Sequence, residues 1–177
     1  MNPLGPLNSK NFGTSVSAWV VTLDALEPFR TAAPPRDQPV ASYLHDPRDS
    51  NFAVELEVEI LSGDSSTLTC RTQLRSMYWT FRQMVAHHTV GGCNLNTGDL
   101  IASGTVSGAE DMEHGCLLEF TQGGKKDFRL TDGSSRVYLC DGDIVKFTGR
   151  ARGAGLSIGF GDCIGQVNPA RPLPDTE

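Results

Sequence analysis

The chain has 177 residues, of which 38% are hydrophobic and 20% charged, a composition typical of a globular domain and not of a disordered segment. Its net charge of -6 and the lack of a basic cluster exclude a nucleic-acid-binding protein or one held on an anionic membrane. No apolar run is long enough to cross a bilayer, and the first residues lack the features of a signal peptide. The five cysteines are scattered without a Cys-x-x-Cys pair, so we expect reduced thiols and a cytoplasmic protein.

Nineteen glycines and ten prolines predict many turns and therefore many short strands. In chain order, residues 15–23 predict a strand, and residues 24–30 predict a single helical turn that Pro28 ends. Residues 31–51 follow as a long irregular stretch that contains four prolines. A loop of that length commonly has a function or covers a neighbouring surface.

The clearest predicted strand spans residues 52–60, where apolar and acidic side chains alternate. Its apolar face points to a core, and a turn at residues 62–65 reverses the chain. Its other face carries Glu55, Glu57 and Glu59. Three carboxylates can attract a divalent ion, but side chains two residues apart are spread along a strand. A solvated strand face is therefore the simpler interpretation.

Residues 72–89 predict one strong helix, because apolar side chains recur there at helical spacing. Thr72 would cap its start, and a pair of glycines would end it. His87 and His88, near its end, raise the alternative of a zinc site. Neighbouring helix residues point roughly 100° apart, so this pair favours packing at the helix end over a shared metal.

Short strands fill the rest of the chain. They are predicted over residues 100–102, 117–121, 128–130, 137–139, 144–148 and 156–160. Two of them follow a Gly-Asp turn, in Gly98-Asp99-Leu100-Ile101 and in Gly142-Asp143-Ile144-Val145. One helix among many short strands predicts a β-rich α+β fold.

Three segments carry candidate site residues, and each has a plain structural alternative. Lys10 and Thr14 lie four apart around a glycine and could face one pocket, although a lone loop lysine is more often solvated. Thr105 lies within Ser-Gly-Thr-Val-Ser-Gly, where glycines let a ligand approach the backbone or form a simple turn. Glu119 falls inside the predicted strand 117–121, where it faces water or is buried beside a partner.

A resemblance to a known family rests on three long strings: LNSKNFGTSVSAWVVTLDAL, MYWTFRQMVAHHTVGGCNLNTGDLIASGTVSG and LCDGDIVKFTGRARGAGLSIGFGDCIGQVNPA. They closely resemble the C-terminal half of the fumarylacetoacetate hydrolase family, from about Pro3 to Ala170. Residues 98–105 match the family's Gly-Asp-x-Ile-x-x-Gly-Thr element. The resemblance implies a mixed β-roll or sandwich with one main helix, N-terminally truncated here, and a homodimer in the intact form.

The resemblance also implies a metal-dependent hydrolase that acts on carbon–carbon bonds in ketonic substances. The expected substrate is a small-molecule diketo acid, 4-fumarylacetoacetate. It is split to fumarate and acetoacetate in the last step of tyrosine and phenylalanine catabolism. In the family, Mg2+ or Ca2+ holds the diketone, a histidine base steered by a glutamate activates water, and cationic and amide donors stabilise the leaving carbanion.

Four residues of this chain match functional residues of the family. Lys10 matches a lysine beside the metal, and since an ammonium cannot ligate a cation, we interpret it as a catalytic charge stabiliser. Thr14 matches a threonine of the metal shell. Thr105 matches the threonine that binds a substrate carboxylate. Glu119 matches the catalytic glutamate that orients the histidine and fixes its tautomer.

The remaining family residues have no match in this chain. The metal carboxylates, the histidine base and the arginine and glutamine donors all lie upstream of its first residue. We therefore expect residues 1–170 to form a partial catalytic domain that is inactive alone, with residues 171–177 as a loose tail. Two alternatives stay open: a non-catalytic chain that keeps the dimer surface, and a related keto-acid decarboxylase or isomerase.

Overall fold

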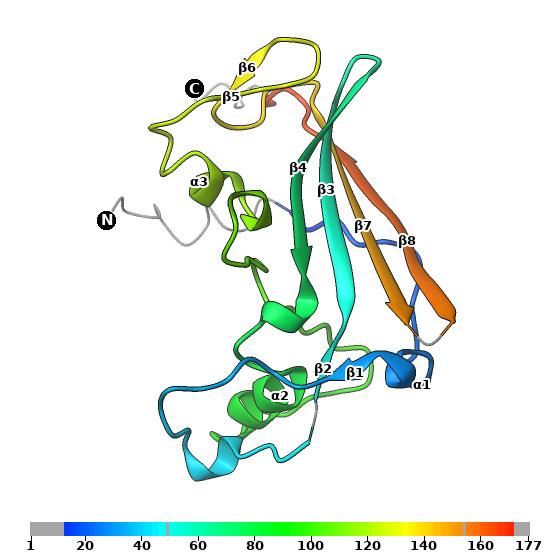
Figure 1. Ribbon diagram of the computed structural model, residues 1–177, viewed down its shortest axis with the longest axis vertical. Coiled ribbons are helices and arrows are strands. Elements are labelled where there is room, and N and C mark those ends of the chain that lie inside the picture. The colour runs from blue at the N-terminus through cyan, green and yellow to red at the C-terminus, as the bar shows by residue number, and fades with distance from the viewer. Residues whose placement is uncertain (1–12, 49, 154, 172–177) are drawn as a thin grey trace, which may run out of the picture.

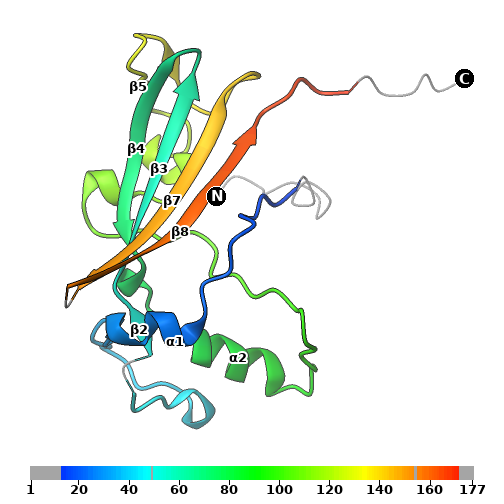
Figure 2. The same cartoon turned by 90° about the vertical axis from the view of Figure 1, so that its right-hand side faces the viewer.

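The fold is built on one antiparallel sheet, drawn in Figure 1 as a computed structural model that describes residues 13–48, 50–153 and 155–171. Four long strands lie in the order β4-β3-β7-β8. They are β3 (Val54–Ser62), β4 (Ser65–Gln73), β7 (Ile144–Gly153) and β8 (Leu156–Gln166). Figure 2 shows the four strands side by side in this order, with α2 beyond one end of the sheet.

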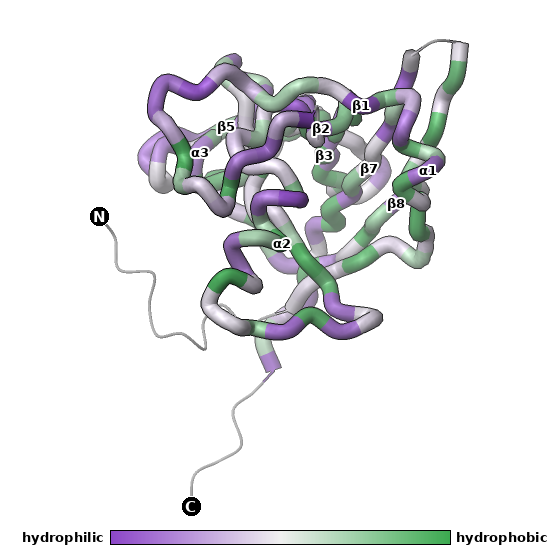
Figure 3. Tube along the Cα trace, turned by 90° about the horizontal axis from the view of Figure 1, so that it is seen from below, coloured by the Kyte–Doolittle hydropathy of each residue, from purple (hydrophilic) through white to green (hydrophobic). Residues whose placement is uncertain are grey.

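The alternation of apolar and acidic residues along β3 gives the sheet two unlike faces. Figure 3 colours the trace by hydropathy and shows hydrophobic and hydrophilic residues following one another along the chain. Val54, Leu56 and Val58 pair with Ala151, Gly149 and Phe147 of β7 on the apolar face. The opposite face is charged. There Glu57 accepts a hydrogen bond from Arg71 (2.6 Å), and Lys146 lies 3.7 Å from Glu59 and 3.6 Å from Asp162. The three glutamates therefore belong to an ion-paired strand face, which agrees with the simpler interpretation of this strand.

The core lies at the end of the sheet where the short N-terminal elements pack. These are α1 (Leu23–Leu26), the 3-10 turn Glu27–Phe29, β1 (Arg30–Thr31) and β2 (Asn51–Phe52). Leu26, Phe29 and Phe52 are buried against Val54 and Ala151 of the sheet. Removing such apolar side chains from water is the main stabilising contribution of this region.

The other described elements are short. They are the 3-10 turns Ser42–Leu44, Leu74–Ser76 and Asp111–Glu113, the helices α2 (Phe81–Thr89) and α3 (Leu117–Phe120), and the strands β5 (Phe128–Arg129) and β6 (Ser135–Arg136). Figures 1 and 2 place α3 beside β4. The fold is β-rich with few helices, which confirms the predicted α+β class. Within the described ranges, no helix has the length and apolar character needed to traverse a bilayer.

The predicted strand at residues 15–23 is wrong. Ser17 Oγ donates to the Phe160 carbonyl (3.3 Å), so the segment runs beside β8, but it forms no described backbone ladder with that strand. Trp19 lies over Gly161, whose φ of 70° takes β8 out of regular strand geometry there. The following helix begins earlier than predicted because Thr22 Oγ1 accepts from the Ala25 amide (3.3 Å) and caps it.

The predicted helix at residues 72–89 begins too early. Thr72 pairs with Leu56 and still belongs to β4. The helix α2 starts at Phe81, where Thr80 and Gln83 form a capping box. The sequence contains this Thr-x-x-Gln signal, but the apolar residues between 74 and 78 extend the helical spacing backward and obscure it.

Among the short predicted strands, three are confirmed and three are wrong. Strands occur at residues 128–129, 144–153 and 156–166, within or beyond the predicted ranges. Residues 100–102 are irregular, and residues 135–136 form a strand in place of 137–139. Residues 117–120 form α3, because Thr121 Oγ1 bonds to the Leu117 carbonyl (2.7 Å) and the next residues take the positive φ that ends a helix.

Candidate functional site

A cavity of about 400 Å³ lies between the apolar face of the sheet and the loop that contains Thr105. Side chains of β3, β7 and β8 supply its apolar walls, among them Leu56, Phe147 and Phe160. Four hydroxyl-bearing residues also line it: Ser17, Thr72, Thr105 and Thr148. A mostly apolar cavity with a few polar groups is typical of a small-molecule site.

Two hydrogen bonds hold the Thr105 loop against residues 113–115. The Gly108 amide donates to the Glu113 carbonyl (3.0 Å), and the Gly115 amide donates to Ser107 Oγ (3.1 Å). A Cβ at Gly115 would lie 2.2 Å from the Val106 carbonyl oxygen and 2.8 Å from Thr105 Cγ2. Such close approach is possible only for glycine, so Gly115 allows its segment to pack directly against Thr105 and Val106.

Glu119 lies on α3 and is exposed, so its predicted place inside a strand is wrong. Its carboxylate is nevertheless tied to the Thr105 loop, because Ser107 Oγ donates to Oε2 at 2.5 Å. The same Ser107 accepts from Gly115, which lines the cavity. The structure therefore brings Thr105 and Glu119 together through Ser107, a residue that the sequence analysis did not single out.

The two N-terminal candidates are less well placed by the structure. Lys10 lies outside the described residues. Thr14 is described and exposed, and no contact within the described ranges joins it to Thr105 or Glu119. Its neighbour Ser17 lines the cavity, so the segment that follows Thr14 does reach the site.

The described residues do not fit a divalent ion by themselves. Within the described ranges, no three His, Cys, Asp or Glu side chains lie close enough together to hold one. Thr14 supplies at most a neutral oxygen, whereas Mg2+ and Ca2+ bind chiefly to carboxylates. The Tyr43 hydroxyl lies at hydrogen-bond distance from His87 Nδ1 (3.1 Å), and the two rings stack, which agrees with the packing interpretation of this histidine.

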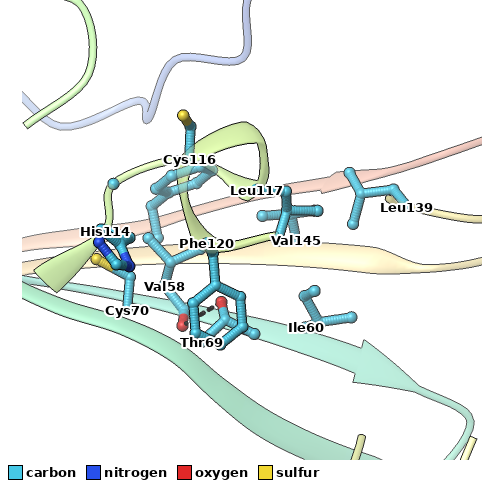
Figure 4. A pocket seen from close by; sticks show the side chains of 12 residues that line it. Val58, Ile60, Thr69, Cys70, His114, Cys116, Leu117, Phe120, Leu139 and Val145 are labelled. Atoms are coloured by element: carbon cyan, nitrogen blue, oxygen red, sulfur yellow. Dashed lines mark hydrogen bonds between the residues drawn. The ribbon is translucent and has the colours of Figure 1, made fainter. Parts of the chain in front are cut away.

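A second, smaller cavity of about 200 Å³ lies between β4 and α3 (Figure 4). It is lined by apolar side chains together with Cys70, His114 and Cys116, and Figure 4 shows the two sulfur atoms pointing apart. Burial raises the pKa of the Cys70 thiol, and the nearby carboxylates Glu113 and Glu119 act in the same direction. This thiol is therefore kept neutral, which suits packing and disfavours nucleophilic use.

Several known proteins resemble this chain along most of its length. Residues 1–168 match the model of the fumarylacetoacetate (FAA) hydrolase C-terminal domain. The fumarylacetoacetase of Aspergillus fumigatus is 50% identical to this chain over 97% of the length of this chain. The fumarylacetoacetases of Arabidopsis thaliana and Homo sapiens are each 46% identical, over 96% and 95% of the chain.

The match covers only part of each relative. The chain spans 40% of the length of the Aspergillus fumigatus protein and 41% of the other two. The similarity nevertheless runs through every segment that forms the cavity, from Ser17 to Cys163. The chain therefore belongs to the fumarylacetoacetate hydrolase family. Nearly the whole length of the chain matches the C-terminal domain of that family.

Proposed function

We propose that this chain is the C-terminal part of a fumarylacetoacetase-type hydrolase, which cleaves a carbon–carbon bond of 4-fumarylacetoacetate to give fumarate and acetoacetate. The observation that carries the proposal is the connection of Thr105 and Glu119 through Ser107 beside a cavity of about 400 Å³. The identity of 50% to a fumarylacetoacetase over the same residues supports it.

The cavity suits the proposed substrate class. A diketo acid has a carbon chain with polar groups along it and a charged end. The apolar walls from the sheet can enclose the carbon chain, while the hydroxyl-bearing residues Thr72 and Thr105 line the same space. Hydroxyl groups donate to carbonyl or carboxylate oxygens, so they can fix the orientation of such a ligand.

Thr105 is the proposed donor to a substrate carboxylate. It is exposed at the cavity, and no described residue forms a hydrogen bond with its hydroxyl. Gly104, with a φ of 77°, turns the backbone directly before it, and Gly115 lets the loop approach closely from behind. The hydroxyl is therefore held in place but free to donate.

Glu119 is the proposed positioning residue for a histidine base. Ser107 occupies Oε2, and no described residue bonds to Oε1. A carboxylate oxygen in this state can accept the N–H of an imidazole, which fixes the tautomer and leaves the other ring nitrogen to take a proton from water. No described histidine contacts Glu119, so we propose that the base comes from polypeptide outside this sequence.

The chain alone is proposed to be inactive. Within its described ranges it offers neither a group able to hold a divalent ion nor a histidine beside Glu119. Members of a catalytic unit act together, so the residues that remain give little rate enhancement without the others.

The proposed function is tested by grafting the chain onto a relative. The chain replaces the matching segment of the Arabidopsis thaliana fumarylacetoacetase, to which it is 46% identical over 172 residues. We expect the graft to hydrolyse fumarylacetoacetate, followed as loss of diketone absorbance. Thr105→Val should mainly raise KM, by the equivalent of about 1–3 kcal/mol for one lost donor. Glu119→Gln should lower kcat at least about 100-fold, because it disables the general base.

Two variants serve as matched controls. Thr97→Val changes an exposed threonine in a turn, and Glu55→Gln changes a glutamate on the charged sheet face away from the cavity. Both should leave kcat and KM unchanged. A correctly folded graft without activity would contradict the proposed function, and turnover by the 177-residue chain alone would contradict its proposed inactivity.

A further inference from the structure

The side chain of Ser107 connects two parts of the candidate site. Its hydroxyl oxygen accepts from the Gly115 amide at 3.1 Å, and its hydroxyl hydrogen goes to Glu119 Oε2 at 2.5 Å. An ionised carboxylate only accepts, so the direction of the second bond is fixed. A hydrogen bond of this length to a charged oxygen is of the strong kind.

Glu119 would be poorly positioned without this contact. It is exposed, and it lies on a helix of only four residues at the side of the sheet. Ser107 holds it in its observed conformation through one oxygen and leaves the other oxygen for a partner. Since Ser107 is only two residues from Thr105, the loop that faces the cavity also sets the position of the carboxylate.

We propose that Ser107 is a positioning residue that keeps the Glu119 carboxylate at a fixed position relative to Thr105. This inference rests on the proposed function. Gly115 completes the arrangement, because its amide orients the serine hydroxyl and its missing side chain lets the two segments meet. A ligand that moves the Thr105 loop therefore also moves Glu119. Binding and base orientation are coupled through one hydroxyl group.

The first test uses the grafted enzyme and the substrate fumarylacetoacetate. Ser107→Ala should lower kcat roughly 10- to 100-fold with KM nearly unchanged, because a misplaced catalytic group costs rate and not affinity. Ser107→Thr keeps the hydroxyl and should restore most of kcat. Ser103→Ala is the control: Ser103 lies in the same loop, but among the described residues its hydroxyl bonds only to the adjacent Gly104 carbonyl, at 3.0 Å.

A second test uses the 177-residue chain itself and needs no activity. Ser107→Ala removes the acceptor of the Gly115 amide, so hydrogen exchange at Gly115 should become faster, while exchange in β7 stays unchanged. Ser103→Ala should leave Gly115 exchange as it is.

The outcomes separate this inference from the proposed function. An active graft in which Ser107→Ala keeps its kcat, or changes only KM, overturns the positioning role and leaves the function standing. A folded graft without activity overturns the function and the role that depends on it. Unchanged Gly115 exchange in the alanine variant overturns the serine contact itself.

Discussion

The segments Gly98-Asp99-Leu100-Ile101 and Gly142-Asp143-Ile144-Val145 share a sequence pattern and form the same local turn. The glycines have φ values of 99° and 93°. In each turn the aspartate amide donates to the carbonyl three residues earlier, at 3.1 Å, and the aspartate carboxylate accepts from the amide of that earlier residue. The surroundings then differ, because residue 144 begins β7 whereas residues 100–102 stay irregular.

The partners of the two aspartates explain the difference. Asp143 is buried and also accepts from Arg136 Nε at 2.9 Å and Nη2 at 3.0 Å, and the strand after it lies between β3 and β8. Asp99 is exposed, and among the described residues its carboxylate accepts only from the Asn96 amide, at 2.7 Å. A short sequence thus determines its own turn, while neighbouring strands determine whether an extended segment becomes part of a sheet.

Hydrogen exchange should reveal the largest difference between the two regions. Residues 144–148 pair with β3 on one side and with β8 on the other, whereas the amides of residues 100–102 have no partner among the described residues. If the sheet opens only by global unfolding, which costs about 5 kcal/mol or more, its exchange should be slower by about 1,000-fold or more. Similar protection in both segments would mean that residues 100–102 form a strand in solution.

Replacing the aspartates should give the next largest difference. Asp143→Asn leaves the Arg136 guanidinium without its charged partner, and since that side chain is only 14% exposed, we expect a loss of about 3 kcal/mol of unfolding free energy. Asp99→Asn is the matched control and should change it by less than about 0.5 kcal/mol. Urea denaturation measures both, and equal losses would refute the distinction.

The smallest expected effect is on how the stability of the fold depends on pH. The hydrogen bonds from Arg136 and the Cys140 amide lower the pKa of Asp143 in the folded state. A lowered pKa stabilises the fold above the unfolded value of about 3.9, and this contribution is lost as the pH falls through the folded value. Below about pH 4, the urea midpoint of the wild type should therefore fall more steeply with decreasing pH than that of Asp143→Asn. Parallel curves would show that the pair does not control acid stability.

Local patterns predicted the parts of the fold that depend on local interactions. The strand predicted at residues 52–60 corresponds to β3 (Val54–Ser62) and could be predicted because its alternation is regular, and the turn after it contains Gly63 at a φ of 56°. The strand β4 was not predicted, and the helix predicted from Thr72 began too early, because Thr72 belongs to β4 through its pairing with Leu56, a contact between residues far apart in the chain. Residues 117–121 were wrong because a four-residue helix and a short strand have similar apolar patterns.

The candidate site was predicted in part. The glycines around Thr105 marked a close approach of the backbone, and the family resemblance pointed to Glu119. The sequence did not reveal that Ser107, twelve residues before Glu119, would join the two. Nor did it mark Gly115, whose importance follows from the position of the Val106 carbonyl and not from its neighbours in the chain.

The segment around Ser17 and Trp19 has a consequence for the behaviour of the chain in concentrated solution. β8 is the last strand of the sheet, and an edge strand with free backbone groups can recruit a strand from another molecule and so lead to aggregation. Ser17 occupies the Phe160 carbonyl, and the Trp19 ring covers Gly161. This irregular segment therefore covers part of the exposed edge of β8. Its detachment would expose backbone groups of β8 that can pair with a strand of another molecule.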